Sequence, residues 1–231
     1  MRNERASILI LAAGTLAAAA TADYTGPIEV GYQVTATDFG GGSITAYVVD
    51  LYMVSNDAAD TLLNVYNWNT VDAGVSFFQS FTGTGWQPTN LGGPFDTGAL
   101  QVADSFVTIG GFGADGRQTP GSGAGTGLDP NFGGKNAAAP GVDAGWYNGS
   151  PPSLNGAVMT YDSGITGTLI GRFASLEGGF SLVCSSFEAT WNQGLGTPGQ
   201  QAGFFWCPSP GSLALMSVAG LTTRGRRRSL G

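Results

Sequence analysis

Short apolar segments separated by glycine-rich turns are the feature that most restricts how this chain of 231 residues can fold. Residues 28–34 alternate apolar and polar side chains, which is the period-2 pattern of a half-buried strand. Other segments are dense in Val, Ile, Phe or Tyr and are bounded by Gly, Pro, Asn or Asp, the residues that turns require. These further predicted strands are residues 43–55, 62–68, 75–81, 105–109, 158–161, 166–175, 180–191 and 200–207.

Many short strands with turns between them predict an all-β fold, an antiparallel β-sandwich or jelly roll. A short helix near residues 57–63 is the expected exception. Residues 110–155 are rich in Gly, Pro, Ala and Asn, and a connection of this length predicts one long, mostly irregular Gly/Pro-rich loop. The loop carries Trp146 and Tyr147, which supply a ligand-binding surface for stacking if they are exposed. The alternative is that both rings fill the core beneath the loop.

Charged residues are distributed unevenly along the chain. The middle of the chain, residues 23–207, carries 3 basic and 15 acidic residues, a net charge of −12, between basic ends. Nucleic-acid binding requires clustered Lys and Arg to neutralise phosphates, and this middle part contains no such cluster. The charge pattern therefore excludes nucleic acid as a partner.

Residues 1–22 have the three parts of a secretory signal peptide. A basic start precedes an apolar run over residues 8–20, and small residues end at Ala22, so cleavage there leaves Asp23 as the new N-terminus. The run is shorter than the ~20 apolar residues of a membrane span. A buried N-terminal helix is the alternative interpretation. We expect residues 23–207 to form the folded domain.

The last part of the chain, residues 208–231, is also tripartite. Pro208, Ser209 and Pro210 interrupt the chain, and the apolar stretch 212–221 follows. An arginine cluster that includes Arg226, Arg227 and Arg228 then holds this end in the cytoplasm. An ordinary C-terminal amphipathic helix is the alternative.

This end resembles a PEP-CTERM sorting tail, with Pro-Ser-Pro in place of the usual Pro-Glu-Pro. The resemblance implies removal by exosortase in a planctomycete-like bacterium that makes extracellular polysaccharide. It also implies export to the cell surface or beyond, with membrane contact only through the transient tail. Residues 60–65 and 105–110 look similar to exported planctomycete β-sandwich proteins of unassigned function, which implies a fold and no activity.

Histidine is absent from the sequence, which excludes His-based catalytic triads, His-ligated zinc and His general bases. Calcium is the one cofactor left open. Asn56, Asp57 and Asp60 offer oxygen ligands within one short loop, and Asp129 and Asn131 do so in another. The alternative is that these side chains serve turns.

A glycoside hydrolase needs two carboxyl groups on either side of the bond that is cut. The middle of the chain has three glutamates, Glu29, Glu177 and Glu188, and the last two are expected on neighbouring strands. No E-x-D-x-x-E pattern is present, and Glu188 is interpreted as a strand residue that faces solvent. The predicted function is therefore a non-catalytic cell-surface or matrix protein that contacts polysaccharide. The alternative is a carbohydrate-active enzyme, glycoside hydrolase-like, that uses acidic residues.

The two cysteines lie in predicted strands on either side of the turn at residues 194–199. A hairpin centred between Leu195 and Gly196 pairs residues whose numbers add up to 391, as those of Cys184 and Cys207 do. Directly opposed residues are close enough for a disulfide, and an exported protein meets an oxidising compartment. We expect this bond; two unpaired thiols are the alternative.

Overall fold

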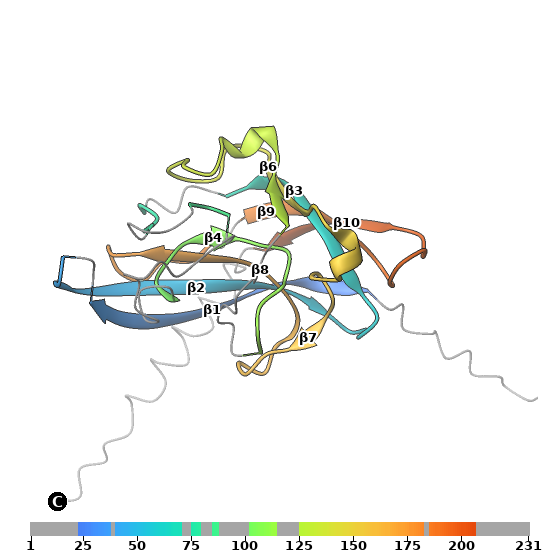
Figure 1. Cartoon of the computed structure of the whole chain (residues 1–231), viewed down its shortest axis with the longest axis horizontal. Coiled ribbons are helices and arrows are strands. Elements are labelled where there is room, and N and C mark those ends of the chain that lie inside the picture. Colours follow the sequence, from blue (N-terminus) through green and yellow to red (C-terminus); the bar gives the residue numbers. More distant parts are fainter. Residues whose placement is uncertain are drawn as a thin grey trace, which may run out of the picture.

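The structure, a computed structural model, describes residues 23–37, 40–70, 75–79, 85–87, 102–114, 125–182 and 185–206. Over these residues the chain forms two antiparallel β-sheets that pack face to face (Figure 1). The predicted all-β antiparallel sandwich is thereby confirmed. The predicted signal peptide at 1–22 and sorting tail at 208–231 lie outside the described residues.

Sheet A has the strand order β1-β2-β8-β4, and β7 pairs with β8 beside this path. Its strands are β1 Tyr24–Thr37, β2 Ser43–Ser55, β4 Phe106–Val107, β7 Met159–Thr160 and β8 Thr166–Ser175. Sheet B has the order β10-β9-β3-β6-β5. Its strands are β3 Thr61–Asn69, β5 Thr126–Leu128, β6 Ala144–Asn148, β9 Ser185–Asn192 and β10 Gln200–Trp206. Two 3-10 turns, Pro130–Phe132 and Pro151–Ser153, flank β6.

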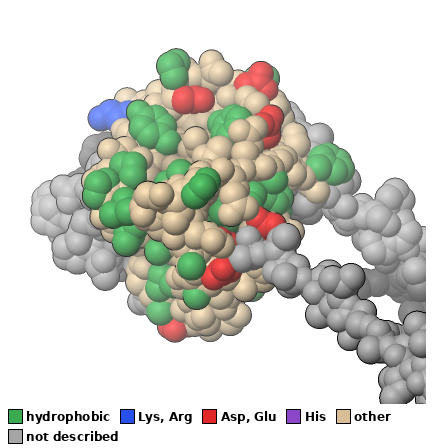
Figure 2. All heavy atoms as spheres, turned by 90° about the vertical axis from the view of Figure 1, so that its right-hand side faces the viewer, with side chains coloured by type: hydrophobic (Ala, Val, Ile, Leu, Met, Phe, Trp, Pro, Cys, Tyr) green, Lys and Arg blue, Asp and Glu red, His purple; other side chains and the backbone are tan. Residues whose placement is uncertain are grey.

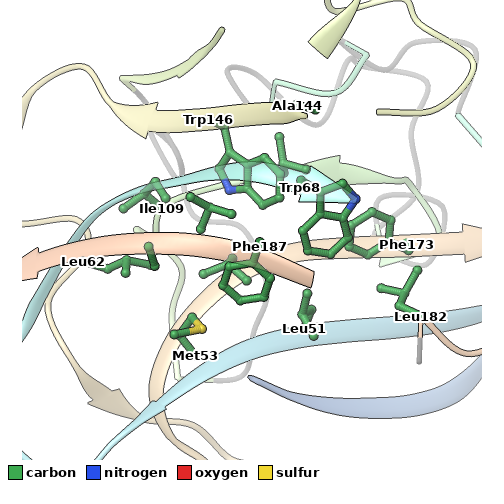
Figure 3. Packing of buried hydrophobic residues seen from close by; sticks show 14 of the residues in the cluster. Leu51, Met53, Leu62, Trp68, Ile109, Ala144, Trp146, Phe173, Leu182 and Phe187 are labelled. Carbon is green, nitrogen blue, oxygen red and sulfur yellow. The ribbon is translucent and has the colours of Figure 1, made fainter. Parts of the chain in front are cut away.

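Aromatic side chains join the two sheets in the main core (Figure 3). Trp68 of sheet B stacks on Phe173 of sheet A, with ring centroids 5.8 Å apart and planes 7° apart. The Trp68 ring also contacts Phe187, at 5.6 Å, and Trp146, at 5.3 Å. Because large rings bury the most apolar area per residue, this cluster is the principal contact that holds sheet A against sheet B.

Sheet A is covered on its outer face as well. Phe106 stacks on Phe112 there, at 4.9 Å, and Tyr52 packs on Tyr161, at 4.8 Å. As a result β8 is buried at every position after its first residue. Strand β2 is therefore rich in apolar residues, as strands buried on both faces are, whereas β8 reaches the same burial with several small and polar residues.

Three sequence predictions about elements are corrected by the structure. Residues 75–79 form no regular strand; Phe77 is apolar because it packs against the core, and the neighbouring Phe78 N–H donates to the Ala174 carbonyl outside any ladder. The helix expected near residues 57–63 is a turn, in which the Asp57 carboxylate accepts from the Ala59 N–H at 2.8 Å. The strand expected from residue 180 begins only at Ser185.

The segment 110–155 is mostly irregular where the structure describes it, as predicted, but it is not a simple loop, because it supplies β5 and β6 to one edge of sheet B. Glycine conceals these strands in the sequence, since it has low strand propensity. At Gly127 a Cβ would lie 2.5 Å from the Tyr147 ring, so a larger residue there would displace this ring from its position. The absent side chain lets this ring lie across the neighbouring strand, on the outer face of the sheet.

Candidate functional site

The outer face of sheet B is polar over most of its strands. On β9, Phe187, Ala189 and Trp191 point into the core, and the residues between them, Glu188 and Thr190 among them, face outward. Neighbouring strands continue this face through the pairs Gln201–Thr190, Thr190–Asn64 and Asn64–Tyr147. One row of amide, hydroxyl and phenol side chains therefore crosses four strands.

A β-bulge on β3 adds side chains to this face. Tyr66 pairs with Glu188 and Asn69 pairs with Ser186, so β3 has one residue more than β9 in this interval. Asn67, at the bulge, has a positive φ of 51°. Since Trp68 remains in the core, the bulge leaves Tyr66, Asn67 and Asn69 together on the outer side.

A groove of about 360 Å³ lies on this face over β3, β9 and β10. It is lined by Asn67, Asn69, Ser186, Phe187, Glu188, Gly203, Phe204 and Phe205. Phe205 is 70% exposed, the second most exposed of the large apolar side chains of the described residues. The groove therefore combines amides and a carboxylate with an unusually exposed aromatic ring.

Hydrogen bonds hold the polar side chains of the groove in place. Asn67 donates to Glu188 Oε1 at 2.8 Å, and Gln201 donates to Oε2 at 3.3 Å. Bonds from Asn67 and then Tyr66 lower the pKa of Glu188 below its ordinary value. Asn69 donates to Asp143 Oδ1 at 2.8 Å. The groove thus presents an ionised carboxylate whose orientation is fixed.

This arrangement has the chemistry that recognises sugars. Amide and carboxylate groups bind the hydroxyls of a sugar ring, and an exposed aromatic ring stacks against its apolar face. A general acid in glycoside hydrolysis needs a raised pKa, so that the carboxyl stays protonated at working pH. The lowered pKa of Glu188 does not fit that role.

The structure separates the two aromatic residues that the sequence singled out. Trp146 is 1% exposed, and its indole N–H donates to the Thr108 carbonyl at 3.0 Å. The prediction that Trp146 binds ligand is wrong, because alternation along β6 turns this ring into the core. Tyr147, the next residue, is 45% exposed and faces outward opposite Asn64.

The side chains proposed for calcium form hydrogen bonds within the fold, and those of Asp57 and Asp129 serve turns, the alternative that the sequence left open. Asn56 Oδ1 accepts from the Asp23 N–H at 2.9 Å, and Asp60 Oδ2 accepts from the Ser55 hydroxyl at 2.6 Å. Asp129 caps the 3-10 turn through the Phe132 N–H. Within the described residues, no three His, Cys, Asp or Glu side chains are grouped so that they could hold a metal ion.

The glutamates lie apart in the fold. Glu177 follows β8 of sheet A, whereas Glu188 lies on β9 of sheet B, so the expectation of neighbouring strands is wrong. Glu29, on β1, accepts from the Ser181 hydroxyl at 2.6 Å. Glu188 faces outward, as predicted.

A buried ion pair on sheet A is a feature that the sequence analysis missed. Arg172 donates to both Asp50 oxygens, at 2.6 and 2.9 Å, and its guanidinium lies 5.4 Å from the Phe106 ring centre. Tyr32 also donates to Asp50, at 3.1 Å. A cavity of about 210 Å³ adjoins the pair and is lined in part by Tyr161. The available signal was one acidic and one basic residue, each adjacent to apolar residues within a strand.

The hairpin of β9 and β10 has the predicted register. Phe187 faces Phe204, and the last described pair is Ser185 with Trp206. Cys184 and Cys207 lie outside the described residues, so their bond remains a prediction. It is the pair that would come next in this register.

Comparison with known proteins gives no match to a family model, to a curated protein or to a solved structure. In the part of the chain that the structure describes, no helix has the length and apolar character needed to cross a membrane. The groove is therefore interpreted from its own chemistry.

Proposed function

We propose that this chain is an exported, non-catalytic β-sandwich that binds polysaccharide through the outer face of sheet B, at the cell surface or in the extracellular matrix. The observation that carries the proposal is the groove over β3, β9 and β10 with Phe205 exposed in its lining. A groove on the surface of a sheet is accessible to an extended polymer as well as to a small sugar.

The rigidity of the groove supports binding. Its amides and carboxylate are fixed by hydrogen bonds to one another, so little conformational entropy is lost when a ligand binds. Two further aromatic residues, Tyr66 and Tyr147, lie on the same face and extend the surface on which sugar rings can stack.

The proposal of export rests on the two ends of the chain. The signal at residues 1–22 and the PEP-CTERM-like tail at 208–231 imply processing by a signal peptidase and an exosortase-type enzyme. We expect the mature protein to begin at or near Asp23 and to lack the arginine tail. Mass spectrometry of the native protein tests this, and an intact segment from Arg226 to Arg228 would exclude removal of the tail.

Binding is tested with a glycan array, with and without calcium, and then by calorimetry on the glycan that binds. Replacing Phe205 by Ala removes the exposed ring and should weaken binding about fivefold, the contribution of one stacked ring. Leu195→Ala is the matched control, because Leu195 is 65% exposed but lies in the β9–β10 turn, outside the groove. Equal affinity in all three proteins would exclude the groove as the binding site.

A further inference from the structure

The charge and hydrogen bonding of the groove indicate which class of polysaccharide it would bind. We infer that the groove selects a polysaccharide of amino sugars with free, protonated amino groups over neutral and acidic polysaccharides. This inference rests on the proposed function. Three observations support it: the sign of the charge around the groove, the direction of its hydrogen bonds, and the position of its aromatic rings.

The charge around the groove is negative. Glu188 lies in the groove, and Asp143 is joined to it through Asn69. Among the described residues the basic side chains are Lys135 and Arg172, and Arg172 is 2% exposed and paired with Asp50. Figure 2 shows acidic side chains spread over one side of the molecule and basic colour only at its margin. A polyanion such as a uronic-acid polymer would be repelled here.

The hydrogen bonds of the groove leave mainly acceptors for a ligand. The amide nitrogens of Asn67 and Gln201 are directed at Glu188, and that of Asn69 is directed at Asp143. Part of the N–H donor capacity of these amides is therefore used within the face, while carboxylate and amide oxygens can still accept hydrogen bonds from a ligand. An ammonium group has three donors and no acceptor, so it is the ligand group that this surface complements best.

The aromatic rings strengthen the same preference. Phe205 lies in the groove beside Glu188, and Tyr66 pairs with Glu188 across the sheet. An aromatic face attracts a cation through its quadrupole and also stacks on the apolar face of a sugar ring. A lysine-rich peptide would share the ammonium group but not the ring that stacks. An amino sugar uses both.

The experiment compares two oligosaccharides with the same sugar backbone, one with free and one with N-acetylated amino groups, binding to the full-length chain by calorimetry. One is a β-linked glucosamine oligomer with free amines, and the other is its fully N-acetylated counterpart. At a pH of about 6, below the pKa of an amino group, the first is cationic and the second neutral. We expect the free amine form to bind about tenfold more tightly, with a preference that decreases as salt is added.

Two glutamate variants assign the preference to the groove. Glu188→Gln removes the charge and keeps the shape, and it should weaken binding of the amine form on the order of three- to fivefold, with little change for the acetylated form. Glu177→Gln removes the same charge from an exposed bend beyond β8 and should change neither affinity. Melting temperatures of both variants confirm that each remains folded.

The failures of the two proposals are distinguishable. Equal binding of the amine and acetylated oligomers, or preference for a uronic-acid oligomer, would overturn the inference and leave polysaccharide binding intact. Two other outcomes would also overturn the inference. They are a preference for the amine form that Glu188→Gln does not reduce, and equally tight binding of an oligolysine. In either case the attraction for the ammonium groups would be non-specific. Absence of binding to every glycan on the array would exclude the proposed function itself.

Discussion

The outer faces of the two sheets each carry a carboxylate. The carboxylate on sheet A is buried and paired with a cation, whereas the one on sheet B is open to solvent. On sheet A, Asp50 is 4% exposed and is neutralised by Arg172 beneath a second apolar layer. On sheet B, Glu188 lines an open groove and is held by neutral amides and a phenol. The covered carboxylate has a cationic partner in the fold, whereas the open one retains its charge toward solvent.

This difference separates a structural polar group from one available to a ligand. Burial alone would lower the pKa of Arg172, but the Asp50 carboxylate outweighs it and raises that pKa. The Tyr161 phenol lines the cavity beside this pair, and desolvation raises its pKa to about 12. These groups keep one protonation state throughout the physiological range, as a permanent internal network does. Strand β8 is thereby fixed to β2 through side chains as well as through its ladder.

The largest expected effect comes from breaking the buried pair. Arg172→Met leaves Asp50 buried without its cation, which should cost about 3–5 kcal/mol in the free energy of unfolding. Urea denaturation followed by tryptophan fluorescence measures this. The double variant Asp50→Leu/Arg172→Met should recover most of the loss, since apolar residues can replace a buried pair. A double variant as unstable as the single one would show that the pair contributes more than charge neutralisation.

Two adjacent residues of β6 allow the stability loss from a core substitution to be compared with that from a substitution on the open face. Trp146→Ala empties a core site that also provides a hydrogen bond, so it should cost about 3–5 kcal/mol. Tyr147→Ala, one position along, removes a half-exposed ring and should cost less than about 1 kcal/mol while weakening glycan binding. Denaturation and calorimetry on both variants test this. Similar losses of stability in the two would contradict the opposite orientation of the side chains.

A smaller effect concerns the edge of sheet B, where the register of β9 with β10 brings Cys184 and Cys207 next in line. We expect a disulfide that contributes about 3 kcal/mol by restricting the unfolded chain. A non-reducing peptide map should contain the two cysteine peptides joined. The Cys184→Ser/Cys207→Ser variant should match the stability of the reduced protein. A map with two free thiols would exclude the bond.

The fold could be predicted from the sequence where side chains alternate cleanly, and the site only in part. The position of the turn between β9 and β10 predicted their register, and a slip by one residue would expose Phe187 and Phe204. The outward position of Asn67 depends on a bulge, which no local pattern marks. Asp50 and Arg172 are 122 residues apart, so only the folded chain brings them together. Trp146 and Tyr147 appeared equivalent because β6, the strand that turns them to opposite faces, has only five residues and lies in a segment rich in Gly, Pro, Ala and Asn.

The smallest effects are expected in the pH dependence of stability, where two carboxyl groups should act with opposite sign. Burial raises the pKa of Asp60, so its contribution to stability is present below about pH 4, the pKa of an unfolded Asp, and is lost as pH rises through the folded pKa. Bonds from Asn67 and Tyr66 lower the pKa of Glu188, so its contribution is present above about pH 4.3 and is lost as pH falls through the folded pKa.

The test measures the free energy of unfolding of Asp60→Asn and Glu188→Gln against the parent protein between about pH 3 and pH 7. Relative to the parent, Asp60→Asn should gain stability as pH rises, because the parent must ionise a buried carboxyl whose Oδ2 is bound to Ser55. Glu188→Gln should lose stability relative to the parent over the same rise, because it lacks a charge that the amides stabilise. Its change should be the smaller, since the group is exposed and solvent screens it. Parallel pH curves for the two variants would contradict the contrast between a buried loop carboxyl and a carboxyl open to a ligand.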